Sequence, residues 1–329
     1  MNPSSRLERD PLLHEVSDLI AVNDLTRGFP ATKVVLIAGP SGFGKTSVLR
    51  AAAELAAAKL EANVLWVPGG IVASEDHLSR LAASAAGGVG AVESARGLRA
   101  LFEYLSSPNH RFILSIDDLD LLAFKRQSIV EILRTAIDRA TNLRLLASCR
   151  PESAARLTKQ MDDRGSSRRA HSVQVRILTP LGEMEALSLI RKRVPTLSPK
   201  QEKAILSEAG GHPAALVFLG RLAELRPDAR VSELLAFAAD FAGAIYAEGW
   251  AALGPQQRAI VWELSLAGEV MTAADISQRL LVPPPQVSSQ LTRLVNEGFV
   301  LRANVRGRFG IVPLLARWVT KRANRGESL

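Results

Sequence analysis

The segment Gly39–Thr46 carries the strongest chemical signal in the sequence. It fits the pattern G-x-x-x-x-G-K-[ST] at every fixed position and follows the apolar run Val34–Ala38, which is typical of a buried strand. Its glycines allow backbone N–H groups to turn inward around phosphate oxygens, which side chains would obstruct. A helix that begins near Lys45 would point its positive end at the same anion. The sequence therefore predicts a phosphate-binding loop between a strand and a helix.

Every residue of this loop is a candidate for nucleotide contact: Gly39, Pro40, Ser41, Gly42, Phe43, Gly44, Lys45 and Thr46. Lys45 is expected to reach the β- and γ-phosphates, and the Thr46 hydroxyl is expected to ligate Mg²⁺. The predicted cofactors are therefore ATP or ADP together with Mg²⁺. The alternative interpretation is a glycine-rich turn that matches the pattern without binding a ligand.

Two adjacent carboxylates, Asp117 and Asp118, end the segment Arg111–Asp118, which is mostly apolar before them. Such a segment is typical of a strand buried on both faces, and open α/β sheets bind ligands at the carboxyl ends of their strands. We predict that Asp117 holds the Mg²⁺ shell and that Asp118 orients or deprotonates the attacking water. The alternative is that these acids, with Asp120, cap the helix that follows.

The apolar segment Leu143–Ser148 predicts a further strand, with Ser148 and Arg150 at its carboxyl end. If this strand lies between the two strands that carry the motifs, a polar side chain here would touch the γ-phosphate. The alternative interpretations are a helix cap for Ser148 and a surface cation for Arg150.

The elements that position these groups alternate along the chain. Five strands are expected at about 33–38, 63–67, 111–118, 143–148 and 173–178, with helices between them, among them two over 75–105. This alternation predicts an α/β fold of the P-loop NTPase type, with a mostly parallel sheet and right-handed crossovers.

The chain as a whole is expected to have four parts. We expect an N-terminal arm and amphipathic helix (1–27), the α/β domain (28–181), a helical lid (182–244) and a C-terminal domain (245–329). The last part reads as three helices, beginning near Pro255, Thr272 and Gln286, and then a hairpin over 299–311. That order is typical of a winged helix-turn-helix.

The charge of the chain indicates an acidic partner. Its net charge is +8 and its pI is near 10; residues 254–329 hold ten Lys/Arg and five Asp/Glu, hence +5 of that total. DNA is the predicted partner, and the candidate contacts lie on the third helix and the hairpin: Gln286, Ser289, Gln290, Arg293, Arg302, Arg306 and Arg308. Further cations lie in the tail, at Arg317, Lys321, Arg322 and Arg325. Alternatively, the winged helix docks another protein or acts as an internal latch.

Composition excludes several other classes. The 47% hydrophobic content allows sizeable cores, but no apolar run approaches the length of a membrane span, so no membrane partner is expected. The N-terminus lacks the apolar stretch of a signal peptide. The single cysteine, Cys149, forms no internal disulfide, which favours a reducing cytoplasm, and it is expected to be a core thiol.

These motifs together resemble the AAA+ and signal-transducing (STAND) branches of the P-loop ATPases. Asp117-Asp118 is similar to the paired acids that end the second motif of STAND proteins, and Ser148-Cys149-Arg150 is similar to their arginine sensor. Gly211-His212-Pro213 resembles a lid motif whose proline lies near the adenine. The resemblance implies a slow ATPase that acts as a molecular switch, with Arg150 sensing the γ-phosphate and Pro213 contacting the base, or else a signalling scaffold.

The loop Asp163–Arg168 resembles a different relative, the origin-recognition-type initiators. In that family a Ser-Arg pair just before the fifth strand supplies an arginine finger to a neighbouring subunit, and a winged helix ends the chain. The resemblance implies self-association, with Arg168 acting in catalysis across subunits. The alternative is a solvated basic loop.

Overall fold

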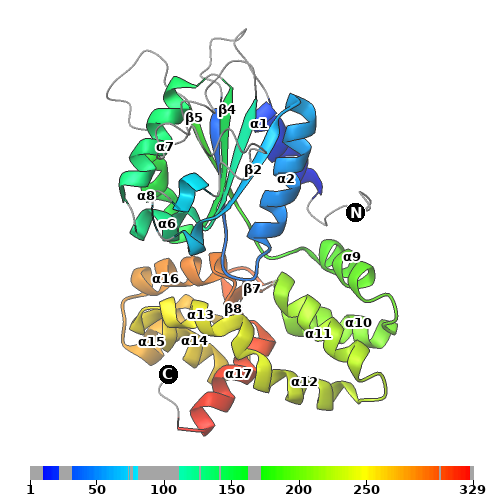
Figure 1. Ribbon diagram of the computed structural model, residues 1–329. Helices are drawn as coiled ribbons and strands as arrows, with labels where there is room; N and C mark the ends of the chain where they lie inside the picture. Colours follow the sequence, from blue (N-terminus) through cyan, green and yellow to red (C-terminus); the bar gives the residue numbers. More distant parts are fainter. Residues whose placement is uncertain are drawn as a thin grey trace. The chain divides into compact units, whose positions relative to one another are not determined.

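The protein is described by a computed structural model (Figure 1) that covers residues 10–21, 32–72, 74, 77–80, 111–125, 127–140, 142–161, 172–303 and 305–326. The N-terminal arm, most of the helices expected over 75–105, and the loop that contains Arg168 lie outside the described residues. The chain divides into two compact units. The first comprises Met1–Gly39 and Lys45–Leu178, and the second comprises Pro40–Gly44 and Thr179–Leu329.

The first unit is built on a five-stranded sheet in which every pairing is parallel. Its strands are β1 (Thr32–Ala38), β2 (Asn63–Pro68), β3 (Phe112–Asp117), β4 (Leu143–Cys149) and β5 (Ser172–Ile177), in the spatial order β2-β3-β4-β1-β5. The predicted α/β fold with a P-loop NTPase-type sheet is confirmed. β4 lies between β3, which ends at Asp117, and β1, which leads into the glycine-rich loop. This is the position in which Ser148 was expected to approach a bound phosphate.

Helices cover both faces of this sheet (Figure 1). The connections from β2 to β5 cross the sheet in one direction, whereas the connection from β1 to β2 runs the other way. Right-handed crossovers therefore place α2 (Lys45–Leu60) on one face and α7 (Gln127–Arg139) and α8 (Pro151–Met161) on the other. Other helices described in this unit include α1 (Asp10–Ala21), which packs along α2, the short 3₁₀ helix η1 (Gly69–Ile71), and α6 (Leu119–Lys125).

The core of the first unit explains why its strands are almost uninterrupted apolar runs. All seven residues of β4 are buried, as are the last five of β1, because the helices exclude water from both faces of the sheet. Cys149 lies within this core and is fully buried. Burial raises the pKa of its thiol to about 12, so the side chain is a core thiol, as predicted.

The second unit is mostly helical. Its helices are α9 (Glu183–Arg193), α10 (Pro199–Ala209), α11 (Pro213–Leu225), α12 (Val231–Phe241), α13 (Gly243–Ala252), α14 (Pro255–Ala267), α15 (Ala273–Leu280), α16 (Pro284–Asn296) and α17 (Pro313–Asn324). A small antiparallel sheet of order β6-β8-β7 joins β6 (Met271–Thr272), β7 (Val300–Arg302) and β8 (Arg308–Ile311).

Local signals set most of these boundaries. The Thr272 hydroxyl accepts a hydrogen bond from the Asp275 backbone at 3.1 Å and caps α15, as predicted. α16 begins at Pro284 instead of Gln286, because the first turn of a helix leaves backbone N–H groups without partners, so prolines fit there. β6 was not predicted, since its two residues form a strand only by pairing with β8.

One cluster of buried residues extends through the second unit, from Leu181 to Val319. The boundary expected between residues 244 and 245 falls inside α13. On that helix, Tyr246 and Trp250 contact Trp318 of α17, with ring centroids 6.4 and 5.8 Å apart. Residues 182–244 and 245–329 therefore share one core.

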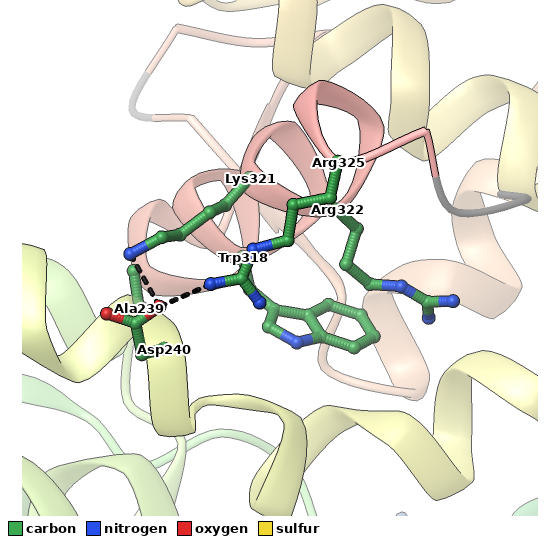
Figure 2. A pocket seen from close by; sticks show the side chains of 6 residues that line it. All are labelled: Ala239, Asp240, Trp318, Lys321, Arg322 and Arg325. Atoms are coloured by element: carbon green, nitrogen blue, oxygen red, sulfur yellow. Dashed lines mark hydrogen bonds and ion pairs between the residues drawn. The ribbon is translucent and has the colours of Figure 1, made fainter.

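The basic tail is tied to neighbouring helices by ion pairs. Figure 2 shows Asp240 of α12 between Lys321 of α17 and Arg325, the residue that follows this helix, beside a cavity of about 150 Å³. The Asp240 carboxylate lies 2.6 Å from Lys321 Nζ and 2.9 Å from the Arg325 guanidinium. The hydrogen bond from Lys321 is the main reason that the pKa of Asp240 is lowered. Arg317 binds Glu208 of α10 through two hydrogen bonds of 2.8 and 3.0 Å. These cations were expected to belong to a surplus of positive charge directed at DNA, but in the structure they form ion pairs with carboxylates of α10 and α12.

Candidate nucleotide-binding site

The loop that follows β1 has the turned backbone of a phosphate cradle. The Gly39 backbone donates a hydrogen bond to the Cys149 carbonyl at 3.1 Å, which holds the start of the loop at the end of β4. Gly42 and Gly44 have φ angles of 76° and 82°, in the left-handed region that favours glycine. α2 begins immediately afterwards, at Lys45, which is half-buried. The loop therefore presents to an anion the geometry that its sequence predicts.

Two oxygen ligands suited to a hard cation meet beside this loop. Thr46 lies in the first turn of α2, and Asp117 is the last residue of β3. The Thr46 hydroxyl donates a hydrogen bond of 2.6 Å to the Asp117 carboxylate. Mg²⁺ prefers oxygen ligands and typically takes one or two from the protein, with phosphates and water supplying the others. This pair fits Mg²⁺ bound together with a nucleotide. The described residues contain no group of three or more His, Cys, Asp or Glu side chains that could hold a metal alone.

Ser148 forms hydrogen bonds with the Asp117 carboxylate and with the Asp118 backbone at the end of β3. Its fully buried hydroxyl donates to Asp117 Oδ1 at 2.5 Å and accepts from the Asp118 backbone N–H at 2.8 Å. Asp118 adopts a φ of 52°, a left-handed conformation that costs energy for residues other than glycine, and the bond from Ser148 helps to hold it. A phosphate contact and a helix cap were the two roles expected for Ser148; the structure adds a role in positioning the Asp117 carboxylate and the Asp118 backbone.

We expect Ser148→Ala to lower the stability of the first unit by roughly 2 kcal/mol, because it removes two buried hydrogen bonds, one of them to a carboxylate. We also expect Mg²⁺-nucleotide affinity to fall by about tenfold, since Asp117 loses its orienting partner. Chemical denaturation and calorimetric titration measure the two effects. Ser47→Ala, at an exposed position on α2, is the matched control. An unchanged affinity in Ser148→Ala would show that Asp117 needs no such support.

Arg150 forms an ion pair with the buried carboxylate of Asp120. Its Nε donates to Asp120 Oδ2 at 2.6 Å, and Glu152 lies 3.5 Å from the same nitrogen. The Asp120 side chain is only 1% exposed. Asp120 was expected only as a possible helix cap, because an ion pair between residues 30 positions apart leaves no local signal in the sequence.

The remaining candidates are placed as follows. Pro213 is the first residue of α11 and follows the buried His212, whose Nδ1 accepts from the Ala215 backbone at 3.4 Å. Burial lowers the pKa of His212 to about 4, so its imidazole is neutral near pH 7. Arg168 lies outside the described residues.

The candidate DNA contacts lie on α16 and on the β7–β8 hairpin. α16 buries Val287, Leu291 and Leu294, which leaves its other face toward solvent. Six of the seven candidates are exposed: Gln286, Ser289, Arg293, Arg302, Arg306 and Arg308. Gln290 is half-buried.

The parallel sheet and the loop between β1 and α2 define the class of this protein: its first unit has the fold of a P-loop NTPase. Residues 35–172, from β1 to β5, match the model of the "ATPase family associated with various cellular activities (AAA)". The chain therefore carries an AAA ATPase domain. No match was found among curated proteins. No helix in the described part of the chain has both the length and the apolar character needed to cross a membrane.

Solved structures of similar fold cover nearly the whole chain. The Walker-type ATPase paby2304 of Pyrococcus abyssi has a TM-score of 0.63 and 15% identity, covering 93% of this chain and 95% of its own. The ORC2 protein of Aeropyrum pernix, solved as ADPNP and ADP complexes, has a TM-score of 0.62 and 18% identity, with coverage of 99% and 97%. The ORC1 protein of Aeropyrum pernix, solved with DNA, has a TM-score of 0.51 and 16% identity, with coverage of 98% and 95%. At these identities the likeness is one of fold.

Proposed function

We propose that this protein is an ATP-binding and slowly ATP-hydrolysing molecular switch whose nucleotide state controls a C-terminal DNA-binding domain. The observation that carries the nucleotide part is the contact between Thr46 and Asp117 beside a complete phosphate-binding loop. The AAA domain match and the nucleotide complexes of the Aeropyrum pernix ORC2 protein support the same ligand.

Each group at the site has a role in this proposal. Lys45 binds the β- and γ-phosphates, while Thr46 and Asp117 hold Mg²⁺, which when bound neutralises charge on the phosphates. Asp118 orients the attacking water from the turn that Ser148 supports. Arg150, held by Asp120, senses the γ-phosphate. Pro213 contacts the base, and Arg168 acts on the nucleotide of a neighbouring copy in an assembled state.

The DNA part of the proposal rests on residues 255–311. The order of α14, β6, α15, α16, β7 and β8, with a small antiparallel sheet, supports a winged helix. In this proposal α16 enters the major groove and the β7–β8 hairpin contacts the backbone. Arg293 and Arg306 are exposed and form no ion pair within the described residues, in contrast to Arg317, Lys321 and Arg325. The Aeropyrum pernix ORC1 protein, of similar fold, was solved with DNA.

Duplex DNA titrated at two salt concentrations tests this proposal. We expect wild-type binding to weaken steeply with salt, because phosphate contacts release counterions. Arg306→Ala should lower the slope of log affinity against log salt by about one unit if this arginine meets a phosphate. Arg193→Ala, an exposed arginine in the last turn of α9, removes the same charge and should leave the slope unchanged. Absence of binding at low salt with ADP, with ATP and without nucleotide would exclude the DNA role.

One observation favours a second function for the same domain, that of an internal latch. Pro40–Gly44, the centre of the phosphate-binding loop, belongs to the same compact unit as the proposed winged helix. In that case the substitution of Arg306 would change nucleotide exchange or assembly, and DNA affinity would be negligible in every nucleotide state.

A further inference from the structure

Five residues of the phosphate-binding loop pack with the second unit, although the residues on either side of them belong to the first. Gly39 and Lys45 are in the first unit, whereas Pro40–Gly44 is in the second. The Gly42 carbonyl accepts a hydrogen bond of 3.1 Å from the Ala214 backbone in the first turn of α11. The loop backbone is therefore attached to the second unit at its centre.

The side chain of Phe43 adds a buried contact to this hydrogen bond and is only 1% exposed. Its ring meets the His212 ring edge-on, with centroids 4.8 Å apart and an angle of 78° between the planes. A Cβ atom built on Gly298 would lie 2.3 Å from Cζ of Phe43. The ring therefore lies directly on the backbone of the turn that follows α16, and only glycine leaves room for it.

This packing constrains the backbone that would bind phosphate. The motif does not specify the residue at position 43, and a solvated side chain there would leave the loop free to change its turn. A buried aromatic ring fixes the peptide groups on both sides of it, because these groups cannot rotate unless the ring leaves its contacts with His212 and Gly298. The neutral imidazole of His212 adds no charge to this apolar contact.

We propose that Phe43 is a positioning residue that holds the phosphate-binding loop in its turned conformation by packing against His212 and Gly298. Nucleotide binding and the packing of Pro40–Gly44 in the second unit then stabilise each other, since coupling between two equilibria is reciprocal. This inference rests on the proposed nucleotide binding. In this inference the packing of Phe43 on Gly298 couples nucleotide binding to the turn between α16 and β7.

Calorimetric titration of Mg²⁺-ADP into the full chain tests the inference. Phe43→Ala is expected to weaken binding by at least roughly tenfold, within the range of typical coupling effects, and Phe43→Leu should recover most of the loss. Gly298→Ala should also weaken binding, because its new methyl group displaces the ring. When the two alanine substitutions are combined, the losses should not add, since both remove the same contact.

A matched control separates the contact from backbone strain. Gly298 and Gly268 have φ angles of 74° and 64°, so alanine is strained at both. A Cβ atom on Gly268, however, would have nothing within 4 Å. Gly268→Ala should therefore lose stability without losing nucleotide affinity. Equal losses of affinity in the two glycine variants would overturn the inference.

The protection of backbone amides from hydrogen exchange by nucleotide provides a second readout. A purely structural role of Phe43 would leave this nucleotide-dependent protection unchanged. In the wild type, Mg²⁺-ADP should slow exchange at residues 212–216 and 297–300, and in Phe43→Ala this protection should disappear. Wild type that fails to bind nucleotide would contradict the proposed function itself. Wild type that binds, with Phe43→Ala showing the same affinity and the same protection, would overturn only the role of Phe43. If Phe43→Ala does not fold, Phe43→Leu and Gly298→Ala carry the same comparison.

Discussion

Lys45→Ala is expected to weaken nucleotide binding by roughly 100-fold in a protein that remains folded. Lys45 is the first residue of α2 and follows a loop whose glycines already have the required turn. Its ammonium group would bind phosphate oxygens through charge-assisted hydrogen bonds, which contribute about 3 kcal/mol, or roughly 100-fold in affinity. Titration with labelled ADP and ATP in the presence of Mg²⁺ measures the loss.

The same helix offers a control for Lys45. Lys59 lies in the last turn of α2, where its ammonium group pairs with Asp18 at 2.5 Å. Lys59→Ala removes an identical side chain from the far end of the helix and should leave nucleotide affinity unchanged. Wild-type affinity in Lys45→Ala would contradict nucleotide binding at this loop.

Asp117→Asn is expected to abolish the dependence of nucleotide affinity on Mg²⁺ and to reduce ATP turnover by at least roughly 100-fold. Because the substitution keeps the shape of the side chain, the hydrogen bond from Thr46 can persist. It removes the negative charge that a hard cation requires. Affinity measured with Mg²⁺ and with a chelator should coincide in the variant and differ in the wild type. Phosphate release measures turnover.

Asp228→Asn provides the comparison for Asp117. Asp228 is exposed in the turn before α12, and its substitution removes one carboxylate charge at a distant position in the sequence. We expect it to change neither turnover nor the response to Mg²⁺. If Asp117→Asn retained a wild-type response to Mg²⁺, the metal role would have to move to another group, with Asp118 the first to examine.

Much of the fold could be predicted because its signals are local. The strand before the loop, the glycine pattern of Gly39–Thr46 and the acids after β3 are each contained in a few consecutive residues. The capping residue Thr272 and the prolines at helix starts set boundaries through their own backbone chemistry. These features need no knowledge of distant neighbours, so the sequence alone indicates the P-loop NTPase sheet and the helices after it.

The contacts within the site were decided by the tertiary structure. Ser148 meets Asp117 and Arg150 meets Asp120 because β4 is the neighbour of β3, and the partners in these pairs lie 31 and 30 residues apart in the chain. Arg317 and Lys321 of the tail form ion pairs with carboxylates on α10 and α12. A simple count of charges had assigned these cations to a positive surplus directed at DNA.

The most distant of these contacts is that of Phe43 with the turn after α16. By itself the sequence determined that a phosphate-binding loop lies at Gly39–Thr46, because the motif depends on consecutive residues. Only the tertiary structure decided that the ring of Phe43 packs on Gly298 and His212. A buried aromatic contact depends on shape at three separated positions in the chain, and none of those positions carries a signal that identifies the others.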